Sequence, residues 1–128
     1  NILIEAGKTL DLDQPVALLL IGVLGHVADT GVARGIVARL MEGLAAGSFL
    51  VQCDGTDSNP DYVAALERYR DSGGVPYNVR GHEQIVSLYE GLEPIEPGIV
   101  QITRWRPEPN AFGDATEVDE LGGVACKA

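Results

Sequence analysis

One run of residues near the N-terminus constrains the fold more than any other feature. Six apolar residues, Val16 to Ile21, follow one another without a polar break, and a glycine-rich turn ending at His26 comes next. Such a run is typical of a strand that is buried on both faces, because helices cover both sides of a parallel sheet. Ligand sites in these sheets lie just beyond the carboxyl ends of the strands, so the turn at 22–26 is the first candidate for a functional site.

Composition limits the class of protein. The 128 residues are 45% hydrophobic, which is enough for a single domain, 1–128, with its own core. The net charge of -10 argues against nucleic-acid and anionic-membrane partners, since both attract clustered Lys and Arg. The apolar run is also far shorter than the roughly 18 residues of a membrane span. Cys53 and Cys126 have no metal-ligand spacing, so we expect no metal site and two free thiols in a reducing, cytoplasmic compartment.

Apolar periodicity and turn residues predict an alternation of strands and helices. The predicted elements are a strand at 16–22, a helix at about 32–46, a strand at 48–53, a helix from 60 to 72, a helix at about 82–90, a β-like segment at 92–105, a loop at 106–120 and a strand at 121–127. Strands joined through helices favour a parallel α/β sheet with right-handed crossovers. The last two strands have no helix between them, so we expect an antiparallel hairpin at one edge.

Four segments, taken in order, resemble a known family. They are Val16–Val27, Gly47–Val51, Gly91–Pro107 and Gly122–Lys127. Together they are similar to the second half of the class I S-adenosylmethionine-dependent methyltransferases, and more narrowly to a bacterial family whose substrate is unassigned. The resemblance implies a Rossmann-like sheet that is parallel except for its last strand, which inserts beside the fifth strand.

The resemblance also implies a cofactor, S-adenosylmethionine, and a small-molecule methyl acceptor that the sequence does not identify. The family's glycine-rich first loop has no counterpart here, so we expect the chain to be the C-terminal part of the domain, with the N-terminal half missing and no activity alone. Two alternatives remain open. One is a non-catalytic half-domain that assembles with another chain, or as a homo-oligomer, through an exposed sheet edge. The other is a different doubly wound nucleotide-binding protein.

The turn after the first strand supplies the predicted cofactor-binding residues. Ile21, Gly22 and Leu24 would contribute backbone and apolar contacts, and Gly22 would permit close approach of a ligand to the backbone. His26 would line the pocket or act as a base. The competing interpretations are a solvent-facing turn histidine and a glycine that serves only the turn. The family's histidine would stand at Gly25, which favours a pocket wall over a catalytic base and leaves the catalytic residue unknown.

The end of the next strand supplies the predicted substrate-binding residues, Cys53 and Asp54. The competing interpretations are core packing for Cys53 and a turn or cap role for Asp54. We expect no Cys53–Cys126 disulfide, because an antiparallel last strand would carry Cys126 toward the opposite edge. The basic and aromatic segment Arg104–Arg106 would pair either with an acidic substrate or with the acidic loop nearby. The competing interpretation is a solubilising edge strand with one packed aromatic side chain.

Overall fold

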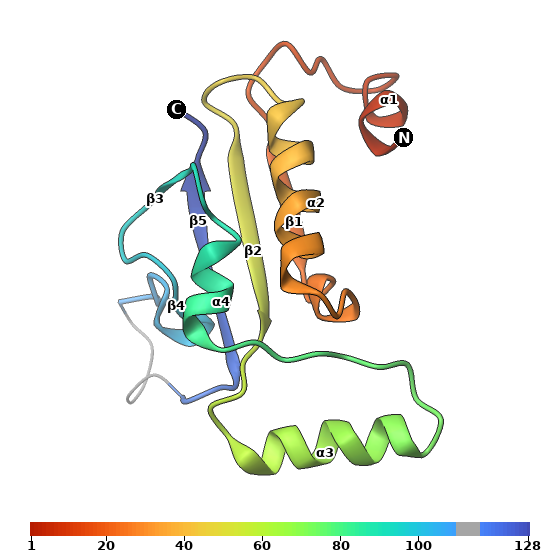
Figure 1. Cartoon of the computed structure of the whole chain (residues 1–128). Helices are drawn as coiled ribbons and strands as arrows, with labels where there is room; N and C mark the ends of the chain where they lie inside the picture. The colour runs from red at the N-terminus through yellow and green to blue at the C-terminus, as the bar shows by residue number, and fades with distance from the viewer. Residues whose placement is uncertain (110–115) are drawn as a thin grey trace.

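The computed structural model describes residues 1–109 and 116–128 of the chain. In chain order its elements are α1 (Ile2–Ala6), β1 (Ala17–Ile21), η1 (Leu24–His26), α2 (Thr30–Glu42), β2 (Phe49–Gly55), α3 (Pro60–Asp71), α4 (His82–Ser87), β3 (Glu93–Pro94), β4 (Val100–Gln101), η2 (Ile102–Arg104) and β5 (Glu120–Cys126) (Figure 1). The elements η1 and η2 are single 3-10 turns.

The five strands form one mixed sheet. Strands β1 and β2 are parallel, and β5 lies antiparallel beside β2, so the last strand of the chain inserts next to the second one. The short strands β3 and β4 pair with the other side of β5, both antiparallel. This arrangement confirms the predicted α/β class, with parallel strands followed by an antiparallel closing unit.

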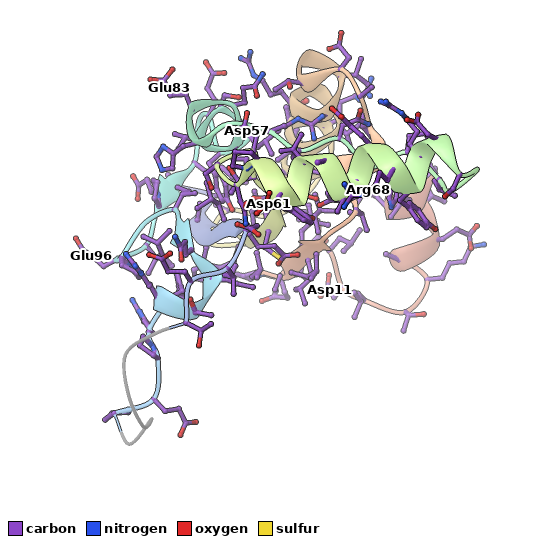
Figure 2. All side chains as sticks on the ribbon, turned by 90° about the horizontal axis from the view of Figure 1, so that it is seen from below. Asp11, Asp57, Asp61, Arg68, Glu83 and Glu96 are labelled. Carbon is purple, nitrogen blue, oxygen red and sulfur yellow. The ribbon has the colours of Figure 1, made fainter. Side chains whose placement is uncertain are left out.

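The helices α2 and α4 cover one face of the sheet, which we call the inner face. Seen from below, both lie on the same side of the strands, with Glu83 marking α4 (Figure 2). The core fills the space between them and the sheet. Its buried apolar members are Leu24, Ala33, Val37, Met41, Leu44, Leu50, Ile85, Leu88, Tyr89, Leu121 and Ala125.

The opposite face, which we call the outer face, departs from the prediction. The strand β1 is apolar on both faces, but its residues alternate between exposed and half-buried, and Leu19 and Ile21 are 60% and 52% exposed. No helix of the described residues lies over them. The expectation of a strand covered on both sides was therefore wrong for this chain as described, because only one face has helices to bury it.

Helix α2 begins as predicted and ends earlier. The Asp29 carboxylate caps its N-terminus by accepting a hydrogen bond from the Val32 amide at 3.0 Å. Gly43 occupies the C-cap, where its amide donates to the Arg39 carbonyl at 3.4 Å and the following amide, of Leu44, donates to the Met41 carbonyl at 3.1 Å. Gly47 has a φ of +86° in the turn that leads into β2, so the helix stops four residues before the predicted end.

The segment at 92–105 contains fewer strand residues than predicted. The segment expected to run as a strand to Trp105 forms only the two-residue β4 and then turns into η2. Residues 96–98 interrupt this segment, with β3 before them and β4 after them. Part of the predicted loop at 106–120 lies outside the described residues. Among those described, no helix has the length and apolarity that crossing a bilayer requires.

Candidate functional site

The candidate site lies where β1 and β2 end. Because the two strands are parallel and in register, Ile21 sits beside Cys53, and the Gly22 amide donates to the Cys53 carbonyl at 2.8 Å. Gly22 has a φ of +69°, and no heavy atom lies within 4 Å of the place where a Cβ would stand. The turn therefore presents bare backbone to open space, beside the half-exposed Ile21 side chain.

A buried arginine, Arg80, holds the next turn, η1, in place by hydrogen bonds. The Arg80 side chain is only 2% exposed and donates to the Leu24 carbonyl at 2.8 Å, to the Val27 carbonyl and to the Thr30 hydroxyl. Leu24 itself packs in the core, so only its backbone lies at the turn. The Arg80 guanidinium thus supplies hydrogen-bond donors to loop carbonyls that do not take part in the hydrogen bonding of the sheet.

Gly25 is the tightest point of the turn. Its amide donates to the Asp54 carboxylate at 3.0 Å, and its carbonyl accepts from the Asn78 backbone at 2.6 Å and side chain at 3.0 Å. A Cβ at this position would stand 2.2 Å from the Tyr77 ring. Any side chain at position 25 would therefore collide with that ring, so this packing of the turn requires glycine.

His26 is exposed at the rim of the site, by which we mean the edge of the sheet where β1 and β2 end. Its Nδ1 is 3.1 Å from the Pro76 carbonyl, which can only accept, so the neutral ring carries its proton on Nδ1 and keeps Nε2 as an acceptor. Its ring also meets the Tyr77 ring edge-on, with centroids 5.3 Å apart. Both contacts hold the imidazole against the connector between α3 and α4.

Cys53 and Asp54 lie side by side in the chain but point to opposite faces of the sheet. The Asp54 side chain is 1% exposed on the inner face, and its two oxygens accept from the Gly25 amide, from the Tyr77 hydroxyl at 2.7 Å and from the Gln52 amide at 2.7 Å. These three hydrogen bonds are what is expected of a side chain that supports a loop.

The outer face carries Cys53, whose thiol is strongly protonated. Burial, as the largest cause, and the nearby carboxylates of Glu120 and Asp54 together raise the pKa of this thiol to about 11. Burial and the carboxylates of Glu120, Asp119 and Asp54 likewise raise the pKa of the Tyr62 phenol. The rim beside Cys53 therefore combines a neutral thiol and a neutral phenol with acidic side chains.

The sequence analysis did not identify the buried residues whose hydrogen bonds support this site. Tyr77, Asn78 and Arg80 come from a connector with no helical or strand period, and Gln52 from the middle of an apolar strand. The only signal in the sequence was chemical, a polar Gln and an Asp near the end of a buried strand.

Trp105 of the Arg104–Arg106 segment lines a hollow on the outer face together with Ile21 and Cys53, whereas the two arginines make other contacts. Arg104 is 3.7 Å from the Glu117 carboxylate, and the Arg106 guanidinium stacks 4.9 Å from the centre of the Trp105 ring. Arg104 therefore pairs with the acidic loop, whereas Arg106 stacks on Trp105 and donates to the Glu96 carbonyl at 3.0 Å. Among residues 1–109 and 116–128 no group of three metal-ligating side chains comes together.

Comparisons with known proteins identify the family and the fold of the chain. A family model described as S-adenosyl methyltransferase matches residues 1–128. A DUF574 family protein from Streptomyces avermitilis, solved by crystallography, is 36% identical with a TM-score of 0.85, and the match covers 98% of this chain and 50% of that chain. A crystal structure of a candidate methyltransferase from Thermobifida fusca shares the fold at 23% identity and a TM-score of 0.82, covering 96% and 47%.

The chain thus spans about half the length of both structures. No protein of curated function matches it. Because the family model extends over every residue, from the short first helix to the last strand, the assignment does not depend on one motif. The chain belongs to the S-adenosyl methyltransferase family.

Proposed function

We propose that the chain forms one wall of the active site of an S-adenosylmethionine-dependent methyltransferase. The observation that carries this proposal is the open turn at Gly22, which lies at the carboxyl end of a parallel strand in a chain of this family. Bare backbone, an apolar Ile21 surface and a free imidazole nitrogen suit a ligand that has an adenine ring and polar edges.

Ile21, Gly22 and His26 would hold the cofactor, with Leu24 supporting the turn from the core. S-adenosylmethionine, when bound, supplies a methyl group on a sulfonium that is already a good leaving group, so the protein contributes chiefly by positioning. His26 keeps Nε2 free to accept a proton from a methyl acceptor. Cys53 would face the acceptor from the outer face, and Asp54 would act on it only through Gly25 and Tyr77.

The test is a titration with S-adenosylhomocysteine, the stable product, followed by the amide resonances of the isotope-labelled chain. We expect weak, saturable shifts with a Kd of about 1 mM. They should centre on Gly22, Val23, His26 and Cys53. Shifts centred elsewhere, or none at several times that concentration, would contradict the proposal.

A matched pair of variants sharpens the test. Gly22→Val places a branched side chain in the open space and should remove the shifts. Gly73→Val is the control, because Gly73 also has a positive φ, +97°, and open surroundings, but lies at the end of α3. Equal loss in both variants would mean that general strain, and not the turn, is responsible.

A further inference from the structure

The connector between α3 and α4 contacts the turn after β1 at several points. It runs past the carboxyl ends of β1 and β2 before it enters α4 (Figure 1). The Pro76 carbonyl lies 3.1 Å from Nδ1 of His26, and both the backbone amide and the side chain of Asn78 donate to the Gly25 carbonyl. The turn therefore rests against a second irregular segment, and not against a strand of the sheet.

The side chain of Arg80, at the end of this connector, holds the turn on both sides of His26. It donates to the Leu24 carbonyl before His26 at 2.8 Å and to the Val27 carbonyl directly after it. Its Nε also donates to the Thr30 hydroxyl, at the start of α2, at 3.0 Å. Because the guanidinium is planar and its donors have a fixed geometry, it holds these three oxygens at set positions relative to one another.

The main chain of Arg80 is anchored to the other strand of the site. Its amide donates to the Gly55 carbonyl at 3.3 Å, and its carbonyl accepts from the Thr56 hydroxyl at 2.9 Å. Thr56 and Arg80 also form an isolated parallel bridge. One residue therefore joins the end of β2 to the turn that follows β1, and so connects the two parts of the candidate site.

The Arg80 guanidinium is buried with carbonyl and hydroxyl oxygens as its partners. Within residues 1–109 and 116–128 it belongs to none of the ion pairs. A buried charge without an opposite charge costs free energy unless hydrogen bonds compensate for the lost water. Here that compensation comes from the turn itself, which favours a role for Arg80 in fixing the shape of the turn.

We propose that Arg80 is a positioning residue for His26, and that it keeps the imidazole in the tautomer with its proton on Nδ1 and with Nε2 free as an acceptor. The Pro76 carbonyl can only accept, so it selects this tautomer of the neutral ring. The selection lasts only while the turn stays against the connector, and the Arg80 side chain holds it there. The inference rests on the proposed function for the use made of His26, but its test involves no cofactor.

Nitrogen NMR of the isotope-labelled chain tests the proposal directly, because the resonances of the two ring nitrogens show which one is protonated. The spectra are recorded at a pH at which the imidazole rings are neutral. His82 is the other histidine of the chain and is exposed at the start of α4, so it is the internal reference for a solvated ring. We expect the Nδ1–H tautomer at His26. The Nε2–H tautomer, which a free imidazole prefers in water, would overturn the proposal if His26 showed it in the unmodified chain.

Two variants and a control separate positioning from stability. Arg80→Lys keeps the charge but cannot span three acceptors, so the Nδ1–H tautomer should be lost and the ring resonances of His26 should approach those of His82. Thr30→Val removes one acceptor at a half-buried position and should move the resonances in the same direction by a smaller amount. Met41→Ala is the control, because it opens a cavity in the core at the far end of α2 and should leave the tautomer unchanged.

Three outcomes count against the assignment. The first is an Nδ1–H tautomer that survives Arg80→Lys in a chain whose circular dichroism is unchanged. The second is an equal change in Met41→Ala, since general loosening of the fold would then be the cause. The third applies if Arg80→Lys does not fold, and it is a Thr30→Val chain whose His26 resonances stay as they were.

The result also separates this inference from the proposed function. A tautomer that depends on Arg80, in a chain whose resonances S-adenosylhomocysteine does not shift, would reject the proposed function and support the positioning of His26. Shifts on titration with a tautomer that ignores Arg80 would do the reverse.

Discussion

Asp54 fixes the geometry of the candidate site although its side chain is buried. It accepts three hydrogen bonds, and the Tyr77 hydroxyl that donates one of them also accepts from the Gly55 amide at 2.9 Å. Gln52, in turn, receives the Tyr89 hydroxyl at 2.7 Å. The network joins the strand, the turn and the connector into one unit, because every donor has a buried acceptor.

Removing one hydroxyl tests this network. We expect Tyr77→Phe to lower the free energy of unfolding by about 1–3 kcal/mol, since the Gly55 amide loses its acceptor and Asp54 loses a donor. Chemical denaturation measures the change. Tyr69→Phe, at a ring that is more than half exposed, is the control and should stay within about 0.5 kcal/mol of the unmodified protein. Equal effects would mean that the network contributes nothing specific.

The Cys53 thiol gives a pH-dependent prediction at the same scale. Its pKa is raised to about 11 from 9.0, so its contribution to stability is complete below pH 9 and is lost as the pH rises toward 11. In the Cys126→Ser background, alkylation of Cys53 by iodoacetamide should be slow at pH 8 and rise with a midpoint near pH 11. Glu120→Gln should lower that midpoint. A midpoint at 9 in both proteins would contradict the assigned environment.

At the scale of elements, α2 is held at both ends by side chains. Asp29 caps its N-terminus, and Lys127, which follows β5, reaches its C-terminus. The Lys127 ammonium donates to the carbonyls of Met41 at 2.8 Å, Glu42 at 3.1 Å and Leu44 at 2.6 Å. A cation at this end complements the helix dipole and satisfies carbonyls that have no partner within the helix.

The chain has only two lysines, and they make a matched pair for measurement. Lys127→Met should destabilise the protein by about 1–2 kcal/mol, because three charge-assisted hydrogen bonds are lost. Lys8→Met removes only an exposed ion pair with Glu5 and should cost less than about 0.5 kcal/mol. Thermal unfolding followed by circular dichroism compares them. A larger effect at Lys8 would show that the cap is not what Lys127 contributes.

At the scale of the whole molecule, the last strand holds the sheet together. Strand β5 pairs with β2 along seven residues on one side and with β3 and β4 on the other. The first helix, α1, has no fully buried residue and lies apart from the sheet, with Leu3 packing against the edge of the core (Figure 1). The C-terminal strand should therefore contribute much more to the stability of the fold than the N-terminal helix.

Truncation at either end tests this difference. Removing residues 120–128 should abolish the cooperative thermal transition, because among the described strands β3 and β4 reach β2 through β5, and because the Lys127 cap is lost. Removing residues 1–6 should shift the melting temperature by less than about 4 °C. Calorimetry distinguishes the two outcomes. A cooperative transition in the chain without 120–128 would show that the core on α2 and α4 suffices.

Much of the fold could be predicted from local patterns. The unbroken apolar run gave β1, the Asn59–Pro60 pair gave the start of α3, and the lack of a helix before the last strand gave its antiparallel pairing. Each of these depends on neighbours in the chain, which is what sequence periodicity reports. The antiparallel pairing also led us to expect no Cys53–Cys126 disulfide. The structure confirms this, because Cys126 lies opposite Phe49 and Cys53 lies opposite Gly122, and both thiols are free.

The sequence by itself therefore determined the α/β class, the family resemblance and the rim where Ile21, Gly22, Cys53 and Asp54 meet. Only the tertiary structure decided that Asp54 turns inward to hold Gly25 while Cys53 turns outward, and that Leu19 is left exposed. The physical reason is that burial depends on which elements lie across each face of the sheet. A strand's own residues alternate faces, but they do not specify what covers either one.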